Sequence, residues 1–496
     1  MRYFFLVLAI LFPVSEILAE EPAGEPMLSP ETLACIGCHE TYTPGIVSDW
    51  RTSRHSKTTP AGGLEKPAIE RRISADNIDP ALKDIAVGCY ECHSRNPEAH
   101  KDNFEHFGFR INVVVSPKDC ALCHPVEESQ YTPSKKGNAN PNLEQNPVYH
   151  ALYSTILGVK QVTDTEISTQ KPSDFTRQDA CFACHGTEVQ AKGMKEIDTK
   201  MGKIMVPDLR NWPNMGVGRV NPDGSRGACT ACHPRHSFSI EIARKPYTCA
   251  QCHLQPDVPA WDVYEESKHG AILFSKGDDW NFTNVPWRPG KDFFAPTCST
   301  CHNSLLLAPD GDVIAQRSHN FGGRLWVRIF GLPYSHPQPK EGNTTAIRNK
   351  DGLPLPTTFA GEPAWEYLID ASEQARRQAV MKAVCNSCHN RDWTNMHFEK
   401  FANTVRETDQ MTLAATKLML TAWEEKLADN KNPFDEGLEQ DWIKQWLFNA
   451  TTARYASAMT GAPDYVAFKY GFWELTNNLR KMKETIEAKR KLKGLK

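Results

Sequence analysis

The stretch Cys249–Gly270, CAQCHLQPDVPAWDVYEESKHG, is the part of the chain that decides the fold. It begins with a CxxCH motif, continues through Asp257 in a Pro-Asp-Val-Pro turn, and ends with His269 in Ser-Lys-His-Gly. The CxxCH motif occurs eight times in the 496 residues, and the eight copies use all 16 cysteines. The copies are Cys35/Cys38/His39, Cys89/Cys92/His93, Cys120/Cys123/His124, Cys181/Cys184/His185, Cys229/Cys232/His233, Cys249/Cys252/His253, Cys298/Cys301/His302 and Cys385/Cys388/His389.

The spacing of the motif indicates covalent haem attachment. Two thiols three positions apart can form thioethers with the two vinyl groups of one porphyrin, and the adjacent histidine then reaches the iron. Zinc ribbons and redox CxxC sites share the cysteine spacing, but they do not explain a histidine after every pair. We therefore expect eight covalently bound haem c groups. They would supply much of the interior of a chain with only 40% apolar residues and a mean hydropathy of −0.51.

The remaining nine of the 17 histidines are candidates for the second axial position of each iron. Eight distal ligands are needed if every haem is bis-histidine, and seven if one catalytic haem is open. We expect His100 and His336 to be surplus surface histidines. The expected distal ligands are His55, His236, His269 and His319, followed by His106, His150 and His397.

The N-terminus predicts export. Residues 1–19 combine Arg2, the apolar run FFLVLAILFPV and a small residue at Ala19, which is typical of a cleaved signal peptide. An uncleaved interfacial anchor is the alternative. No other run approaches the roughly 18 apolar residues of a membrane span. The expected location is the periplasm, and a net charge of −3 gives no indication of nucleic-acid binding.

Composition divides the rest into a haem-rich region, 20–362, with seven motifs, and a helical region, 363–496, with the eighth. Loops are expected at 132–147 and 203–227, and FGFRINVVV is the best strand candidate. The predicted fold is mainly α, a multihaem cytochrome c with a haem-packed N-terminal part and a long-helix C-terminal part. Helical periodicity is strong over 364–384, 399–429, 436–459 and 465–493.

Four further stretches carry a resemblance to a known family. They are YEESKHG, SHNFGGRLW, CHPRHSFS and PDYVAFKYGFWEL, which accompany eight CxxCH motifs with no CxxCK variant. Together they resemble the octahaem hydroxylamine oxidoreductases, with their relatives hydrazine dehydrogenase and the reductive octahaem enzymes that act on nitrite. The resemblance covers nearly the whole chain after the signal peptide.

The resemblance implies that the fourth haem, attached at Cys181 and Cys184 with His185 as its ligand, is five-coordinate and catalytic. It also implies a homotrimer joined through the C-terminal helices. The family's Pro-Asp-His-Pro element reads Pro-Asp-Val-Pro here, so Asp257 keeps the carboxylate that could act as general acid or base. Val258 replaces the histidine, for which His336 or His100 could substitute. An Asp turn residue before a proline is the plain structural alternative for Asp257.

Oxidative members of the family carry a tyrosine that bonds covalently to the catalytic haem of a neighbouring subunit, and Tyr465 and Tyr470 are the candidates here. Packed helix tyrosines are the alternative. The expected function is multi-electron redox chemistry on hydroxylamine or a related small nitrogen compound, with a small cytochrome c as electron partner. Three alternatives stay open: reduction of nitrite to hydroxylamine or ammonia, which Val258 favours, electron transfer without a substrate, and reduction of tetrathionate or sulfite.

Overall fold

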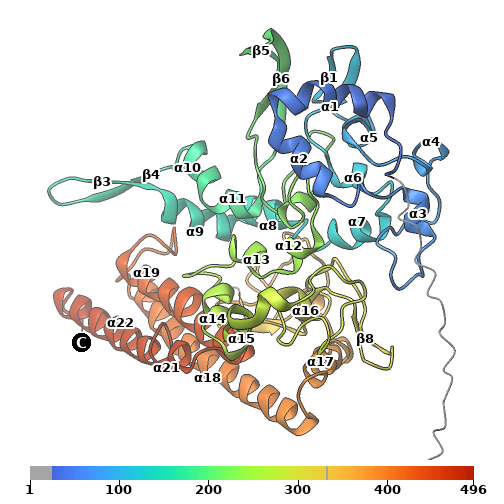
Figure 1. Cartoon of the computed structure of the whole chain (residues 1–496). Helices are drawn as coiled ribbons and strands as arrows, with labels where there is room; N and C mark the ends of the chain where they lie inside the picture. The colour runs from blue at the N-terminus through green and yellow to red at the C-terminus, as the bar shows by residue number, and fades with distance from the viewer. Residues whose placement is uncertain (1–24, 331–332, 496) are drawn as a thin grey trace, which may run out of the picture.

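Helices dominate the computed structural model, which describes residues 25–330 and 333–495. The prediction of a mainly α fold is confirmed. Figure 1 shows short helices and loops in the N-terminal two thirds of the chain and long helices in the C-terminal third. The predicted signal peptide, residues 1–19, lies outside the described residues.

Many short helices of the first part begin with proline. Pro fits the first helical turn because its fixed φ suits a helix and its missing N–H would have had no partner there. The short α-helices are α1 (Pro30–Tyr42), α2 (Pro44–Thr52), α3 (Pro60–Leu64), α4 (Pro80–Lys83), α5 (Cys89–His93), α6 (Pro117–Cys120), α7 (Pro125–Tyr131), α8 (Ala139–Glu144), α9 (Pro147–Leu157), α10 (Asp174–Asp179), α11 (Cys181–His185), α12 (Ile240–Arg244), α13 (Tyr247–Ala250), α14 (Ala260–Glu265), α15 (Lys268–Lys276) and α16 (Cys298–His302). Single 3₁₀ turns are η1 (Cys229–Ala231), η2 (Gly277–Asp279) and η3 (Trp365–Tyr367).

The helical turn also explains the geometry of the motifs. Helices α5, α11 and α16 each coincide with one CxxCH motif, and α1 contains another. Residues three and four apart lie on the same side of a helix, so both thiols and the histidine point in one direction. Each such turn therefore presents its three reactive groups to one side.

The strands form isolated two-stranded antiparallel hairpins. FGFRINVVV supplies β2, as predicted, but β6 shows that the expectation of irregular chain over 203–227 was wrong at its start. Two hairpins project from the body (Figure 1): β3 with β4, and β5 with β6. The pairs are β1 (Asn103–His106) with β2 (Phe109–Asn112), β3 (Val159–Val162) with β4 (Ile167–Gln170), β5 (Gln190–Thr199) with β6 (Gly202–Arg210), β7 (Leu306–Leu307) with β8 (Val313–Ala315), and β9 (Val327–Arg328) with β10 (His336–Pro337).

The C-terminal part consists of long helices close to the predicted ranges. The first of them starts later than expected, and the predicted helix over 436–459 contains a π-helical segment. The loop predicted over 132–147 was also wrong, because α8 lies within it. The helices are α17 (Ala371–Asn386), α18 (Arg391–Glu424), α19 (Gly437–Ile443), the π-helix η4 (Lys444–Ala450), α20 (Thr451–Ala458), α21 (Pro463–Ala467) and α22 (Phe472–Leu492).

One apolar core joins these helices. Met419 of α18, Trp442 of α19 and Met482 of α22 are each 0% exposed, and Val148 of α9 packs in the same cluster. The cluster therefore includes side chains from before residue 363, and the division into two regions remains a prediction. Within the described residues, no helix is long and apolar enough to cross a membrane.

Candidate functional site

The motif histidines are oriented through their Nδ1 atoms. Nδ1 of His93 donates to the carbonyl of Asn112 at 2.7 Å, and Nδ1 of His185 donates to the carbonyl of Ala139 at 3.1 Å. Such bonds fix the ring and leave Nε2 available for a metal. No disulfide joins any of the 16 cysteines, all of which lie in the described residues, so each thiol is available for a thioether bond. These side chains fit the cofactor that the motifs predict.

Three of the predicted distal histidines lie directly opposite a motif histidine. The ring centres are 6.3 Å apart for His39 and His106, 6.3 Å for His124 and His55, and 6.2 Å for His389 and His269. Two imidazoles bound on opposite sides of one iron, each at about 2 Å, place their ring centres about 6 Å apart. The three pairs therefore have the separation that a haem between them needs.

Two further pairs are indicated by electrostatics. Burial and the nearby His93 lower the pKa of His236 to about 4. Burial and the nearby His233 lower the pKa of His319 to about 4. Imidazoles with such low pKa values are neutral near pH 7, which is the form that binds iron.

The structure does not bring the other two predicted distal ligands into such pairs. His150 is exposed on α9, and its ring contacts Tyr153 at 4.9 Å. His397 on α18 lies beside Trp393, and its Nε2 is 3.2 Å from the carbonyl of Ala458. Neither histidine is positioned as the five paired ones are.

The expectation that His100 and His336 are surface histidines was wrong, since each is only 3% exposed. His100 lies between Asp102 and Asp119, with nitrogen to oxygen distances of 3.1 Å to each carboxylate. Two neighbouring carboxylates compensate for burying the ring, so the site favours a charged imidazolium. Sequence spacing could not show this because Asp119 is brought to His100 by the fold.

Thiols from different motifs lie next to one another. Burial and the neighbouring thiols both shift the pKa values of these cysteines. Because each neighbouring thiol belongs to another motif, the contacts show which motifs are adjacent, and the adjacent motifs form a branched series. Motifs one, two, three, five, six, seven and eight follow one another, and the fourth joins at the sixth. The neighbouring pairs are Cys35/Cys89, Cys92/Cys123, Cys120/Cys229, Cys232/Cys249, Cys184/Cys252, Cys249/Cys298 and Cys301/Cys385.

Two of the predicted attachment cysteines are more exposed in the polypeptide than the other fourteen. Cys38 of the first motif and Cys388 of the eighth are exposed, whereas the other cysteines are half-buried. Their motifs are the two ends of the main series, so no further motif covers them on the outer side. Exposure does not prevent a thioether bond, because the thiol needs only to reach the vinyl group. Cys38 and Cys388 therefore remain predicted attachment sites, but at the surface of the polypeptide rather than inside it.

The fourth motif has different surroundings. In the part of the chain that the structure describes, no histidine ring stacks against His185, whose charged neighbours are Asp257, Lys136 and Arg328. Burial lowers the pKa of His185, and Asp257 opposes that effect. Asp257 is exposed in the polypeptide alone, yet desolvation still raises the pKa of its carboxyl group. The family resemblance had implied a carboxyl group near this motif, at the Asp257 of the Pro-Asp-Val-Pro element.

Two more groups of this site were missed by the sequence analysis. Burial raises the pKa of Tyr455 on α20 to about 12, with Arg328 and Asp257 as its charged neighbours. Arg328 pairs in register with His336 across the β9–β10 hairpin. Burial and Arg328 lower the pKa of His336 to about 3. No local pattern marks Arg328 or Tyr455, because they come from a hairpin and a helix far apart in sequence.

The His336 side chain has one free nitrogen. Its Nδ1 donates to the carbonyl of Pro337 at 2.7 Å, whereas its buried Nε2 has no partner. A neutral ring with Nδ1–H bonded offers an acceptor lone pair at Nε2. His336 and His185 thus share Arg328 as a neighbour, and the substitution of His336 for the histidine absent at Val258 remains a prediction.

The two candidate cross-linking tyrosines differ in position. Tyr465 is 5% exposed, and its hydroxyl lies 3.3 Å from Glu266 of the same chain. Tyr470 is 37% exposed and has a positive φ of 59°. The hydroxyl of Tyr465 is thus engaged within its own subunit, while Tyr470 faces outward.

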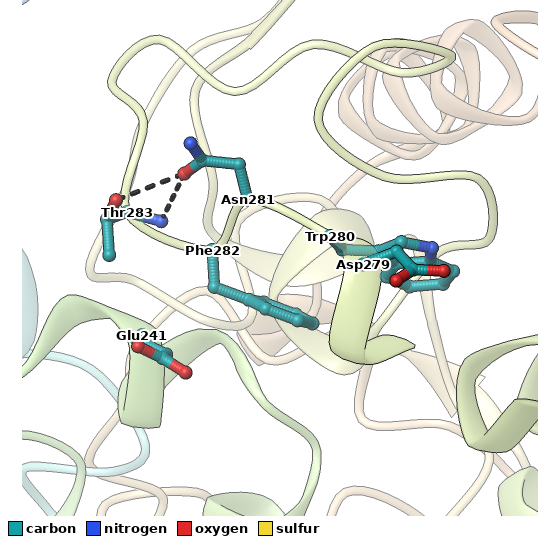
Figure 2. Close-up of a pocket in the computed structure, with 6 residues that line it drawn as sticks. All are labelled: Glu241, Asp279, Trp280, Asn281, Phe282 and Thr283. Carbon is teal, nitrogen blue, oxygen red and sulfur yellow. Dashed lines mark hydrogen bonds between the residues drawn. The ribbon is translucent and has the colours of Figure 1, made fainter. Parts of the chain in front are cut away.

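A surface pocket elsewhere has a different character (Figure 2). The amide oxygen of Asn281 accepts hydrogen bonds from the backbone and the hydroxyl of Thr283 at 2.9 and 3.0 Å, which closes a turn. Two carboxylates make this pocket unsuited to an anionic substrate. It is lined by Glu241, Asp279, Trp280, Asn281, Phe282 and Thr283.

Comparisons with known proteins agree with these features. Residues 221–310 match a family model described as seven times multi-haem cytochrome CxxCH. The chain is 26% identical over 413 residues to a probable nitrite reductase-hydroxylamine oxidoreductase fusion protein of Kuenenia stuttgartiensis. The match covers 81% of this chain and 39% of that protein, so the chain spans about two fifths of the curated relative.

Solved structures extend the similarity to nearly the full chain. A hypothetical multiheme protein is 40% identical, with a TM-score of 0.89 over 95% of this chain and 98% of the other. A reducing HAO-like protein complex of Kuenenia stuttgartiensis shares the fold at 17% identity, with a TM-score of 0.61 over 95% of this chain and 89% of that chain. With its CxxCH motifs, paired histidines and this fold, the chain belongs to the multihaem cytochromes, which bind haem c covalently, and it is similar to hydroxylamine oxidoreductase-like proteins.

Proposed function

We propose that this protein is an octahaem oxidoreductase that reduces nitrite, or a similar nitrogen oxyanion, at the haem attached to Cys181 and Cys184. The observation that carries the proposal is the set of groups around His185. Five other motif histidines meet a second imidazole, whereas His185 has the carboxyl group of Asp257 and the guanidinium of Arg328 as neighbours. The phenol of Tyr455 neighbours both of these groups. A haem bound there would supply an open iron that binds the nitrogen of the substrate and exchanges electrons with it.

The protein side chains supply charge and protons. Arg328 is a fixed cation that attracts an anionic substrate, and its planar donors suit two oxygens of one group. Asp257, whose pKa is raised by burial, holds its proton at higher pH than an ordinary carboxyl group and can deliver it. Tyr455 stays protonated, and Nε2 of His336 accepts a hydrogen bond from an N–H or O–H of the reduced nitrogen.

Reduction is the direction that these groups favour. Nitrite takes up electrons and protons together and loses an oxygen atom as water, so a protonated carboxyl group and a cation both assist. The engagement of Tyr465 with Glu266 further supports a catalytic haem without a tyrosine cross-link from that residue. The name of one Kuenenia structure, a reducing HAO-like protein complex, agrees with this direction, whereas the Kuenenia fusion protein is named for both nitrite reductase and hydroxylamine oxidoreductase.

The test compares two directions of turnover in the purified holoprotein. Nitrite consumption is measured with reduced methyl viologen, and hydroxylamine oxidation is measured with ferricyanide. We expect nitrite reduction in the wild type, and Asp257→Asn should lower kcat by about 10² to 10⁴ because proton delivery is lost. The matched control is Asp351→Asn, an exposed carboxylate in a loop.

Three results would overturn the proposal. Turnover of hydroxylamine without any nitrite reduction would assign the oxidative direction. A wild-type protein with no high-spin haem, and no spectral change with nitrite or hydroxylamine, would leave electron transfer as the function. Turnover of tetrathionate or sulfite alone would place the substrate among sulfur oxyanions.

The wider organisation is part of the same proposal. We infer eight haems, export to the periplasm after removal of residues 1–19, a homotrimer formed through the C-terminal helices, and a small cytochrome c as the electron donor. The series of neighbouring thiols supports long-range electron transfer through the chain. The pyridine haemochrome assay and light scattering of the exported protein measure the haem number and the subunit number.

A further inference from the structure

The sixth motif, Cys249/Cys252/His253, lacks one of the paired histidines. Five motif histidines have a distal partner, whereas the two remaining predicted distal ligands lie elsewhere: His150 is exposed, and His397 contacts a backbone carbonyl. The side chain that does meet His253 is a lysine. Nζ of Lys136 is 3.1 Å from Nε2 of His253, the atom that should bind the iron.

The positive charge of Lys136 affects the pKa values of three groups of this motif. Besides burial, Lys136 lowers the pKa of His253. The pKa values of the Cys249 and Cys252 thiols are lowered to about 7. Their hydrogen bonds to thiols of other motifs are the larger cause, and the charge of Lys136 adds to the effect. The lysine thus lies near both attachment thiols and the proximal histidine of one haem.

The backbone holds Lys136 in a tight turn. The hydroxyl of Ser134, which is 4% exposed, accepts the N–H groups of Lys136 and Gly137 at 3.2 and 3.3 Å. A Cβ at position 137 would lie 2.4 Å from the carbonyl oxygen of Thr132, so only glycine lets the chain pass so closely. The Lys136 amine lies 5.6 Å from the ring centre of Phe321, which borders the side chain.

The charge of the lysine has no compensation at this place. In the described parts of the chain, Nζ contacts His253 and borders the Phe321 ring, and no carboxylate lies within 4 Å of it. In addition to burial, its charge also lowers the pKa values of His185 and His302. A neutral amine is a lone-pair donor, and its binding to iron releases one proton, as metal binding by any protonated ligand does.

The distance is also suitable. Two nitrogens on opposite sides of one iron, each at about 2 Å, are about 4 Å apart. The observed 3.1 Å is about 1 Å shorter, which a four-carbon stem can accommodate through its rotatable bonds.

We propose that Nζ of Lys136 is the sixth ligand of the iron attached at Cys249, Cys252 and His253. The Cys252 thiol neighbours Cys184 of the fourth motif, so the amine-ligated haem is the direct electron neighbour of the proposed catalytic haem. A saturated amine has no π orbitals, unlike imidazole, and therefore gives this haem an electronic spectrum and a reduction potential distinct from those of bis-histidine haems. The assignment does not depend on the direction or substrate of turnover.

The experiment uses magnetic circular dichroism in the near infrared and electron paramagnetic resonance of the oxidised holoprotein. The charge-transfer band of low-spin ferric haem differs between histidine–amine and bis-histidine ligation. We expect one histidine–amine component in the wild type. In Lys136→Leu that component should disappear and one additional high-spin haem should appear, because leucine cannot bind iron, whereas Lys136→His should convert it to bis-histidine without added high-spin signal. Lys66→Leu, at an exposed lysine, should leave every band unchanged.

The readouts separate ligation from folding and from turnover. Haem content and thermal stability of each variant establish that it is folded and fully loaded, and Lys136→His serves as the folded control if the leucine variant is unstable. A wild-type spectrum without a histidine–amine band would overturn the assignment, as would an unchanged band in both variants. Failure of the proposed nitrite reduction would leave this spectroscopic result unaffected.

Discussion

The buried His100 site allows a stability prediction of definite size. The His100 side chain is 0% exposed, and Asp102 and Asp119 lie 3.1 Å from its two nitrogens. These carboxylates also hold backbone: Asp102 accepts the N–H of Val114 at 2.8 Å, and Asp119 accepts the N–H of Ser116 at 2.7 Å. The site therefore fixes the segment that leads into the third motif at Cys120.

The raised pKa of His100 sets the size of the stability loss expected in His100→Gln. Burial alone would lower it, but the hydrogen bonds and charges of the two carboxylates raise it from 6.5 to about 10. This rise corresponds to about 5 kcal/mol of stabilisation by the charged ring. Removing one partner of a buried charged pair typically lowers the free energy of unfolding by a similar amount, about 3–5 kcal/mol. We expect His100→Gln to lower the Tm by roughly 5 °C or more.

The sign of the pH dependence follows from the raised pKa. The contribution is fully present below about pH 6.5, and it is lost as the pH rises through the folded-state value of about 10. The stability difference between wild type and His100→Gln should therefore shrink between pH 7 and pH 10.

Differential scanning calorimetry of the holoprotein at several pH values measures this difference, and His150→Gln is the control because His150 is exposed. The reasoning is refuted if His100→Gln melts within a degree of wild type at pH 7. A stability difference that stays constant up to pH 10 would also contradict it.

Three further predictions concern single side chains. His106→Ala should add one high-spin haem because it removes the ring opposite His39, whereas His150→Ala should add none; electron paramagnetic resonance distinguishes them. Arg454→Met should lower the free energy of unfolding by about 3–5 kcal/mol, since Arg454 is 0% exposed and its loss leaves Asp409 without its guanidinium partner. A lower Tm would measure this loss. Gly186→Ala should lower the free energy of unfolding by at least about 2 kcal/mol, because Gly186 has a φ of +88° and a Cβ would lie 2.3 Å from the amide nitrogen of Arg219. An unchanged Tm would show that the turn after His185 does not require glycine.

Much of the haem-binding scheme could be predicted from the sequence because it is local. A CxxCH motif places its three groups within one helical turn, so attachment sites follow from five consecutive letters. The long helices after residue 363 were also predictable, because their apolar residues recur with a helical period. The starts and ends of those helices, and the π-helical segment over Lys444–Ala450, depend on packing and were not predicted. Nor did the motifs indicate that Cys38 and Cys388 are exposed, because burial of a thiol depends on which other segments cover it.

The opposite axial positions show where local reasoning ends. Counting gave nine histidines for the available irons, but only the fold places His106 against His39 and buries His100 between two carboxylates. A lysine opposite His253 could not enter a count of histidines at all.

The sequence by itself determined that the chain binds haem c, how many attachment motifs it has, and that Asp257 lies close behind the sixth of them. The tertiary structure decided which thiols are neighbours, that Arg328 and Tyr455 gather near His185, and that His336 is buried beside Arg328. The physical reason is the range of the interactions. Attachment uses groups within one helical turn, whereas axial ligation and proton delivery use groups that only the packing of distant segments brings together.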